Sequence, residues 1–584
     1  MVRVLSIDAG TSSIKVIMAR LDGAATWKVE KSYAEPLAPP HCNRHIPGSS
    51  EQDANTWWTA MVVAVKAVLG SGNVDYVSLS GQMQSCLLVT ADGSTIRPAL
   101  LYSDTRATVE AEALEASLGR DRLLREATNW KGAASSLPKL CWLLAHEGEN
   151  CHRADHICLS AHDYLFWRLT GVVATDPTNA SVTGLLHAGG GDGDSNHDER
   201  LEWAFSLLAD AGLPPDLIAK LPPVRRASNC LAPLSASAAA ALGDGSGVLA
   251  GAKVCLGSGD LGSTTVGALG LRPPSSAAGL SALEDINDRC ADSYCYLGTS
   301  GWVATVRSEA DSTSGCERAF KVHHPFAGVR ILAAPMTTAG GNVRWLCGLL
   351  FPGVAEEAAL SSFESEARKA PAGCDGLLYL PYLQGERCPV SDPDARACFV
   401  GMGPHTGRAH MCRAVLEGIA FAVRSLLPLL PAERSTYKPH AHLTPVLGSA
   451  IEDATWRGAG SYSFEPGMIE EILPPIALVG GVANSHVLAT ALASVLNREV
   501  RVVAAPSHVP ALGAAALAVA AAGHTVSATE EKVGAQLRGA AQYSSFHPNP
   551  NQLSTYSAAY KRFCGLHPSL QETFSGARTS GALD

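Results

Sequence analysis

Three widely separated segments share one pattern, in which a short apolar run meets a turn of Gly with Thr, Ser or Asn and an apolar pattern then resumes. They are VLSIDAGTSSIKVIMA at 4–19, CYLGTSGWVATV at 295–306 and IALVGGVANSHVLATAL at 476–492. Each pattern predicts a strand that ends at a turn. The first two turns can close hairpins whose backbone N–H groups and hydroxyls suit phosphate oxygens. The third predicts a strand, a turn and a helix that begins near Asn484 and Ser485, both favoured N-cap residues.

The distance between these segments constrains the nucleotide-binding class. A dinucleotide-binding protein concentrates its glycines in one GxGxxG unit and a Walker ATPase shows GxxxxGK[ST], and neither motif stands in a convincing place. The three turns must therefore converge from different parts of the fold. At 584 residues the chain is long enough for two large domains with a cleft between them. The Pro/Ser-rich stretch Arg272–Ala277 predicts the hinge, and surface insertions are expected at 189–200 and 427–475.

Composition narrows the choice of partner. The net charge of -10 and the scarcity of Lys/Arg runs argue against nucleic acid and against an anionic membrane surface, so a small-molecule ligand is expected. The longest apolar stretch, Val509 to Ala522, is too short to span a bilayer and predicts a buried helix. Sixteen scattered cysteines without a CxxC pair predict reduced thiols, and the start of the chain lacks a signal-peptide pattern. A cytoplasmic location follows as an expectation, with an organelle matrix as the alternative.

Two metal-like patterns are weak. The cluster Cys151, His152, His156, Cys158 and His162 contains two histidines four residues apart, but its spacing fits no recurrent zinc pattern. The run of Asp and Asn at 192–198 begins like a calcium loop, yet His197 stands where the sharp turn needs Gly, and Trp203 stands where a carboxylate should close the shell. A solvated loop is the favoured interpretation of the second pattern.

Two carboxylates suit phosphoryl transfer. Asp8 ends an apolar strand directly before the first Gly/Thr/Ser turn, where an acidic residue is repulsive to phosphate unless a cation intervenes. Asp8 is therefore a candidate ligand of Mg²⁺ or of its water, the alternative being a turn Asp that caps its own backbone. Asp260 lies in VCLGSGDLGSTTVGALG after another strand and is the candidate general base that accepts a proton from the attacking hydroxyl. An ordinary turn Asp is the alternative there too.

Two further segments suit sugar recognition. LSGQMQSCLLV carries Gln82, Met83 and Gln84, and ALLYSDTRA carries Asp104 and Arg106. Planar amides and carboxylates bind vicinal hydroxyls, while an apolar neighbour covers the carbon chain. Met83 is equally a core residue by type, and the two charged residues equally suit a structural ion pair.

The ordered set of segments resembles the FGGY carbohydrate kinases over nearly the whole chain. The matching segments are IDAGTSSIKV at 7–16, LSGQM at 79–83, LLYSDTRA at 100–107, DYLFWRLTG at 163–171, GSGD at 257–260, YLGTSG at 296–301, AGGNVRWL at 339–346, LPYLQGERCPVSDPDAR at 380–396, RAVLEGIAFAVRSL at 413–426 and ALVGGVANS at 477–485. The resemblance implies an α/β protein of two RNase H-like, actin-like ATPase domains around a cleft where ATP, Mg²⁺ and sugar meet. An N-terminal domain over 1–271, a C-terminal domain over 272–572 and a flexible tail over 573–584 are expected.

The resemblance also implies roles for individual residues. Asp260 becomes the general base and Asp8 the metal site. The nucleotide and its phosphates would meet Gly10, Thr11, Ser12, Ser13, Lys15, Gly298, Thr299, Ser300, Gly340, Arg344, Gly480, Gly481 and Ser485, with the adenine near Trp345. Glycine permits close approach of the backbone to the nucleotide.

Within the family the chain looks most similar to xylulokinases and related pentulose kinases, with three departures. Gln84 replaces the usual His after Met, Ser103 stands where Asn is usual before Asp104, and Leu261 follows the candidate base as in sedoheptulose kinases. Phosphorylation of D-xylulose is the expected activity, with D-ribulose and sedoheptulose as alternatives. A non-catalytic sugar or nucleotide sensor and an ATPase driving a protein partner are the rival classes. A homodimer remains open.

Overall fold

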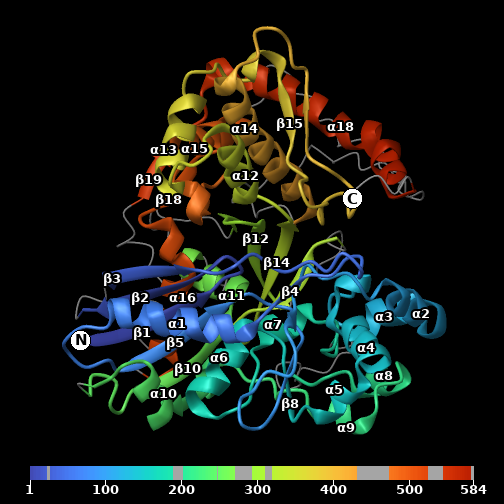
Figure 1. Ribbon diagram of the computed structural model, residues 1–584. Helices are drawn as coiled ribbons and strands as arrows, with labels where there is room; N and C mark the ends of the chain where they lie inside the picture. The colour runs from blue at the N-terminus through green and yellow to red at the C-terminus, as the bar shows by residue number, and fades with distance from the viewer. Residues whose placement is uncertain are drawn as a thin grey trace, which may run out of the picture.

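The computed structural model describes residues 1–22, 27–188, 201–245, 247–269, 293–309, 318–430, 473–523 and 543–579. It consists of two lobes, each built on a mixed β-sheet with helices on its faces (Figure 1). The expected hinge at 272–277 and the loop at 189–200 lie outside the described residues. So does most of the expected insertion, of which the start forms the short 3-10 helix η6 (Leu427–Leu429).

The first lobe contains a six-stranded sheet in the order β3-β2-β1-β5-β10-β9. Its strands are β1 (Val2–Ala9), β2 (Ser13–Leu21), β3 (Trp27–Pro36), β5 (Tyr76–Gly81), β9 (Leu231–Pro233) and β10 (Lys253–Gly259). Strands β1, β2 and β3 pair antiparallel, whereas β5 runs parallel to both β1 and β10. The carboxyl ends of β1, β5 and β10 therefore meet at one edge of the sheet.

The second lobe repeats this plan in a seven-stranded sheet, in the order β13-β14-β12-β11-β17-β18-β19. Its strands are β11 (Ser293–Leu297), β12 (Gly301–Ser308), β13 (Phe320–His323), β14 (Val329–Met336), β17 (Ile476–Val479), β18 (Val500–Val503) and β19 (Tyr543–Phe546). The five strands β14-β12-β11-β17-β18 have the same order and directions as β3-β2-β1-β5-β10. This duplication confirms the expected two-domain α/β fold.

Helices cover the faces of both sheets. A further group of short helices, called the satellite below, extends the first lobe. The first lobe contains α1 (Ala54–Val68), α6 (Ala161–Thr170), α7 (Pro177–Val182), α10 (Ala236–Ala241) and α11 (Asp260–Leu269), and its satellite holds α2 (Thr108–Leu118), α3 (Arg120–Glu126), α4 (Ser136–His146), α5 (Gly148–Arg153), α8 (Phe205–Asp210) and α9 (Pro215–Ile218). The second lobe holds α12 (Gly340–Leu350), α13 (Glu356–Ala367), α14 (Arg408–Leu426), α15 (His486–Leu496) and α18 (Leu553–Thr579). Short strand pairs are β4 (Glu51–Gln52) with β7 (Ala99–Leu100), β6 (Leu87–Val89) with β8 (His156–Cys158), and β15 (Leu378–Leu380) with β16 (Cys398–Val400).

Helix α16 (Val509–Ala521) is buried, as the Ala-rich stretch predicts, but it lies on the sheet of the first lobe (Figure 1). The Ser6 hydroxyl of β1 donates to the Ala511 carbonyl at 2.6 Å, and the Ser78 hydroxyl of β5 donates to the Ala514 carbonyl. Helix α16, which follows the expected boundary at 271/272 in the chain, therefore packs on the first lobe. Helix α18 runs to Thr579, into the segment that is expected to be a tail. Among the described residues, no helix combines the length and the hydropathy that crossing a membrane requires.

Candidate active site

The first two Gly-containing turns close hairpins, as predicted, and they meet between the lobes. In the turn between β1 and β2, the N–H of Gly10 donates to the Ser13 carbonyl at 3.1 Å. The turn between β11 and β12 comprises Gly298, Thr299 and Ser300. The Ser12 Oγ lies 3.3 Å from the Thr299 Oγ1, so hydroxyls from turns almost 290 positions apart in the chain face each other. The convergence that the sequence required is therefore present for this pair.

Helix α12 adds a cation and an aromatic ring beside these turns. Arg344 Nη1 donates to Thr299 Oγ1 at 3.2 Å, and its Nε forms an ion pair of 2.7 Å with Glu356. The arginine is exposed and can change partner. Trp345 is 39% exposed, and its ring centroid lies 6.4 Å from that of Tyr379. A cation and an exposed indole next to a hydroxyl-lined turn suit a nucleotide.

The third predicted turn lies directly against the second. Gly480 has a φ of +97°, and a Cβ there would lie 2.4 Å from the Leu297 carbonyl oxygen. The N–H of Gly340 donates to the Gly298 carbonyl at 2.8 Å, and a Cβ on Gly340 would lie 2.6 Å from the same oxygen. These positions need glycine because backbones approach closely there. Gly481, in contrast, borders open space.

Ser485 is the N-cap of α15, as the sequence predicts. Its hydroxyl accepts the N–H of Leu488 at 3.1 Å and donates to Glu364 Oε2 at 2.6 Å. Both contacts are structural, so the hydroxyl is already engaged by the protein. Asn484, the other expected cap residue, ends the 3-10 helix η7 (Gly481–Asn484) that precedes it.

The two candidate carboxylates lie at the carboxyl ends of β1 and β10, the two strands that flank β5 in the first lobe. Asp8 lies on β1 opposite Lys15 of β2 and accepts the Ser80 hydroxyl at 3.1 Å. Burial raises the pKa of Asp8, although Lys15 and Ser80 oppose that shift. Asp260 begins α11 just after β10, and its Oδ1 accepts the Leu261 N–H at 2.8 Å.

Burial raises the pKa of Asp260 to about 7, and the negative charge of Asp8 adds to the increase. The two carboxylates therefore lie within electrostatic reach of one another. A carboxyl that titrates near neutral pH is suited to exchanging a proton with a substrate.

A buried network fixes the backbone that leads into Asp260. Asp176 Oδ1 accepts the Ser258 hydroxyl at 2.8 Å, and its Oδ2 accepts the Gly259 N–H at 3.1 Å. His162 Nε2 lies 2.8 Å from Asp176 Oδ2. Although burial alone would raise it, the hydrogen bonds from His162, Ser258 and Gly259 hold the pKa of Asp176 below its ordinary value. His162, one residue of the zinc-like sequence cluster, is therefore engaged with the carboxylate of Asp176 at hydrogen-bond distance.

Three side chains predicted to meet sugar, two amides and a methionine, occupy the loop after β5. The Thr11 hydroxyl donates to Gln82 Oε1 at 3.2 Å, which connects this loop to the turn between β1 and β2. Met83 packs against Gly259, where an added Cβ would lie 2.2 Å from its sulfur. Gln84 has a φ of +60°, and its amide donates to the Ala134 carbonyl at 3.1 Å. The loop is therefore held between the first turn and the segment that carries Asp260.

Asp104 and Arg106 form a buried ion pair, which is the structural alternative that the sequence left open. The shortest distance joins Asp104 Oδ2 and Arg106 Nη2 at 2.6 Å. The same arginine Nη2 lies 2.7 Å from Glu51 Oε1, and the Ser50 N–H donates to Asp104 at 2.7 Å. Both side chains have protein partners and are nearly inaccessible to solvent.

Two side chains of the second lobe near Asp260 received no role from the sequence. Tyr296 of β11 stacks on Trp302 with ring centroids 4.0 Å apart. The Arg387 guanidinium lies 5.7 Å from the ring centroid of Tyr102, and its positive charge opposes the increase in the Asp260 pKa. Arg387 lies in the polar run LQGERCP, and Tyr296 comes two residues before the turn glycine; these were the only signals in the sequence.

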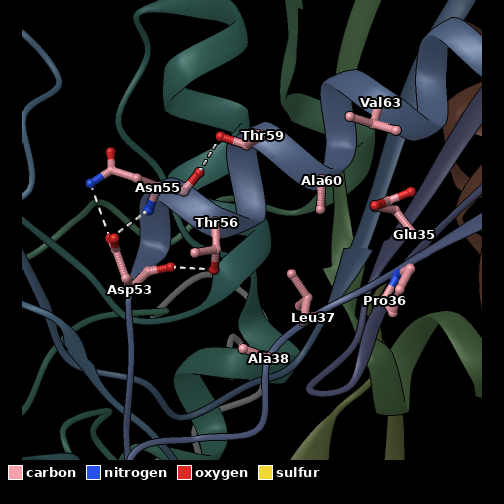
Figure 2. Close-up of a pocket in the computed structure, with 10 residues that line it drawn as sticks. All are labelled: Glu35, Pro36, Leu37, Ala38, Asp53, Asn55, Thr56, Thr59, Ala60 and Val63. Atoms are coloured by element: carbon pink, nitrogen blue, oxygen red, sulfur yellow. Dashed lines mark hydrogen bonds between the residues drawn. The ribbon is translucent and has the colours of Figure 1, made fainter.

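A hollow of about 410 Å³ lies elsewhere on the first lobe, between the end of β3 and the start of α1 (Figure 2). It is lined by Glu35, Pro36, Leu37, Ala38, Asp53, Asn55, Thr56, Thr59, Ala60 and Val63. Asp53 Oδ1 accepts the Asn55 N–H at 2.9 Å and thereby caps α1. Neither candidate carboxylate lines this hollow, so it is distinct from the site between the lobes.

Comparison with known proteins agrees with the fold. Residues 3–267 match the N-terminal domain of the FGGY family of carbohydrate kinases, and residues 293–522 match its C-terminal domain. The xylulose kinase of Bacillus subtilis (strain 168) is 30% identical over 78% of this chain and 81% of its own length. That of Staphylococcus xylosus is 28% identical over 74% and 80%. The ligand-bound xylulose kinase structure from Lactobacillus acidophilus superposes with a TM-score of 0.72 at 21% identity, covering 99% of this chain and all of that one. The chain therefore belongs to the FGGY family of carbohydrate kinases, in which a phosphoryl group passes from ATP to a sugar.

Proposed function

We propose that this kinase phosphorylates a ketose, with D-xylulose as the first candidate and xylulose 5-phosphate as the product. The observation that carries the proposal is the arrangement of Asp8 and Asp260 at the carboxyl ends of β1 and β10, on either side of β5, beside two hydroxyl-bearing turns that meet across the lobes. Several relatives at 28–30% identity are xylulose kinases, which favours a pentulose. D-ribulose and sedoheptulose are the alternative substrates.

Asp260 acts as the general base in this proposal. Its ionised carboxylate accepts the proton of the sugar hydroxyl as the hydroxyl oxygen attacks the terminal phosphorus of ATP. The O–H bond breaks while the new O–P bond forms, and ADP leaves. The pKa near 7 makes Asp260 basic enough to take the proton and still largely ionised in a slightly alkaline solution.

The turns hold the nucleotide. Ser12, Thr299 and Arg344 supply hydroxyl and guanidinium donors to the phosphates. The open space at Gly481 leaves room for the nucleotide. Trp345 offers a partly exposed surface to the adenine. Ser485 stabilises the start of α15 through its hydrogen bond to Glu364.

Asp8 suits Mg²⁺, because its carboxylate is a hard oxygen donor that accepts one hydrogen bond, from Ser80, among the described residues. Bound there with ATP, the ion would neutralise charge on the phosphates. The negative charge of Asp8 would repel the phosphates of ATP unless such a cation lay between them. Lys15, opposite Asp8 on β2, offsets part of that charge.

The loop with Gln82, Met83 and Gln84 is the proposed floor of the sugar site. Because Asp104 and Arg106 are buried and paired with each other, we propose that they hold the neighbouring Tyr102 segment in place. Leu261 supplies an apolar surface beside the base.

A screen of ADP release across ketoses and polyols tests the proposal. Purified enzyme with Mg-ATP should release ADP above the sugar-free rate with at least one ketose, and the product should be a sugar phosphate by mass. Binding of sugar without turnover would support the sensor instead. ATP hydrolysis that ignores every ketose would support an ATPase with a protein partner.

A further inference from the structure

Tyr296, on β11, carries a hydroxyl to which the proposed function assigns no role. Tyr296 is partly exposed, and in the described part of the chain no group hydrogen-bonds its hydroxyl. A polar group held this way in a protein cleft is available to a ligand. Neither the fold nor the packing of β11 explains the hydroxyl, because a Phe ring could make the same stacking contact with Trp302.

The hydroxyl lies against the second phosphate turn. A Cβ added to Gly298 would lie 2.5 Å from the Tyr296 hydroxyl oxygen, so the turn and the phenol occupy adjoining space. Gly298 is thereby required not only by the turn but also by the tyrosine that lies next to it. The donor is consequently beside the group of atoms proposed to bind phosphate.

The ring is held in place from below. Trp302, on which it stacks, donates from Nε1 to the Tyr294 hydroxyl at 3.0 Å. Tyr294 in turn lies 2.8 Å from the Thr265 hydroxyl of α11, the helix that Asp260 begins. The phenol is therefore fixed relative to the proposed base, and preorganisation of this kind is what makes a donor effective in a transition state.

Both carboxylates act on the phenol. Burial raises the pKa of Tyr296, and the negative charges of Asp8 and Asp260 add to the increase. The hydroxyl thus lies within reach of both the proposed metal ligand and the proposed base, and it keeps its proton at neutral pH. It can donate a hydrogen bond but cannot serve as a second base.

We propose that the Tyr296 hydroxyl donates a hydrogen bond to the phosphoryl group in transfer from ATP to the sugar. The assignment rests on the proposed function, since the phosphoryl group must pass between the Asp8 side and the Asp260 side of the cleft. Charge on its equatorial oxygens is then met by a fixed donor from the second lobe, in addition to the proposed metal. Tyr296 is in this sense a catalytic residue supplied by the second lobe, whereas the base Asp260 is supplied by the first.

The Tyr296→Phe variant isolates the hydroxyl, because it keeps the ring and its stacking on Trp302. Loss of one such donor should lower kcat by about 100-fold, with the KM for ATP and for the sugar changed by less than about threefold. Binding of ADP with aluminium fluoride and sugar, a mimic of the transferring phosphoryl group, should weaken by at least about tenfold, while ADP alone binds as in the wild type. The matched control is Tyr33→Phe, on the outer strand β3, which should leave all of these values unchanged.

The outcomes separate this inference from the proposed function. If kcat of the Tyr296→Phe variant falls by less than about tenfold, or if the sugar KM rises while kcat is unchanged, the role of the hydroxyl is overturned. If Asp260→Asn is then still inactive, only the inference about Tyr296 has failed. If both variants turn over like the wild type, the assignment of Asp260 as the base has failed as well, whereas the proposed function itself fails only if no ketose stimulates ADP release by the wild type. Thermal unfolding and ADP binding of the variant establish that it is folded before its kinetics are compared.

Discussion

The burial of Asp260 favours its proposed role as a base but destabilises its ionised form in the folded protein. Its position at the start of α11, among buried groups and near Asp8, raises its pKa to about 7, far above the ordinary value of 3.8. A base that titrates near neutral pH can accept a proton efficiently. The same burial makes the ionised carboxylate costly to the folded state, because the unfolded chain would solvate it.

The Asp260→Asn variant should therefore be more stable than the wild type at alkaline pH. A carboxyl with a raised folded-state pKa destabilises the protein progressively as pH rises from about 4, and the cost is complete above about 7. Removal of the charge should raise Tm at pH 8, and the difference should disappear as pH approaches 4. Scanning calorimetry across this range measures it. A difference in Tm that does not change with pH would contradict the assigned burial.

Gln84 bears on substrate preference. Its backbone has a left-handed φ of +60° and its amide is held by the Ala134 carbonyl, so the loop presents a fixed surface. In the Gln84→His variant the ranking of xylulose, ribulose and sedoheptulose by kcat/KM should change by about tenfold for at least one pair, while the KM for ATP stays within about twofold. An unchanged ranking would remove Gln84 from the specificity of the enzyme.

The sequence reveals some of these residues better than others. Asp8 and Asp260 each follow an apolar strand and precede a Gly/Ser turn, so their type and place are readable locally. The burial of Arg106 is not, because it depends on Glu51 from a distant strand. Tyr296 and Arg387 were missed for the same reason, since their neighbours Asp260 and Tyr102 lie far away in the chain.

At the scale of elements, the two sheets repeat one strand order, and helices α11 and α16 cross tightly on the first. A Cβ on Gly513 would lie 1.8 Å from the Ser263 carbonyl oxygen, and one on Gly267 would lie 2.3 Å from that of Val509. The hairpins and the burial of α16 were predictable from apolar runs. The lobe on which α16 packs was not, because an Ala-rich helix that is apolar on all sides carries no directional signal.

Gly513→Ala tests the importance of this helix contact. The added methyl group must push α16 away from α11, which should lower the free energy of unfolding by about 1–3 kcal/mol and reduce kcat through displacement of Asp260. Gly565→Ala in α18 is the matched control, because a Cβ there meets open space. The control should gain about 0.5–1 kcal/mol from helix propensity. Urea unfolding measures both, and equal stabilisation of the two variants would show that the helices tolerate separation.

At the scale of the whole molecule, the lobes are joined unequally along their boundary. Beside β13, Asn129 exchanges two hydrogen bonds with the backbone of Lys321, at 2.7 and 2.8 Å, and the Thr178 hydroxyl donates to the His323 carbonyl at 2.9 Å. At the turns of the two hairpins, the described contacts between the lobes involve exposed side chains: the Ser12 hydroxyl lies 3.3 Å from the Thr299 hydroxyl and accepts a long hydrogen bond of 3.5 Å from Arg344. Two lobes and a cleft were predictable from chain length and the spaced turns, whereas the α16 crossover between the lobes was not.

This asymmetry predicts closure about the β13 side. Sugar together with a non-hydrolysable ATP analogue and Mg²⁺ should draw the lobes together and decrease the radius of gyration in solution, because ligands then bridge the turns. Small-angle X-ray scattering of wild-type protein, with and without both ligands, measures the change, and either ligand alone should produce less of it. Scattering curves that superpose in all states would contradict closure.

The transfer of the hydroxyl proton to Asp260 is tested most directly by comparing turnover and binding in Asp260→Asn. With the ketose that the screen identifies, kcat should fall by about 10²–10⁴-fold, whereas sugar and ATP should bind with affinities within about threefold of the wild type by calorimetry. The change replaces one carboxylate oxygen by an amino group of similar size, so the fold around residue 260 should remain intact. Turnover equal to that of the wild type would contradict the assignment of Asp260 as the base.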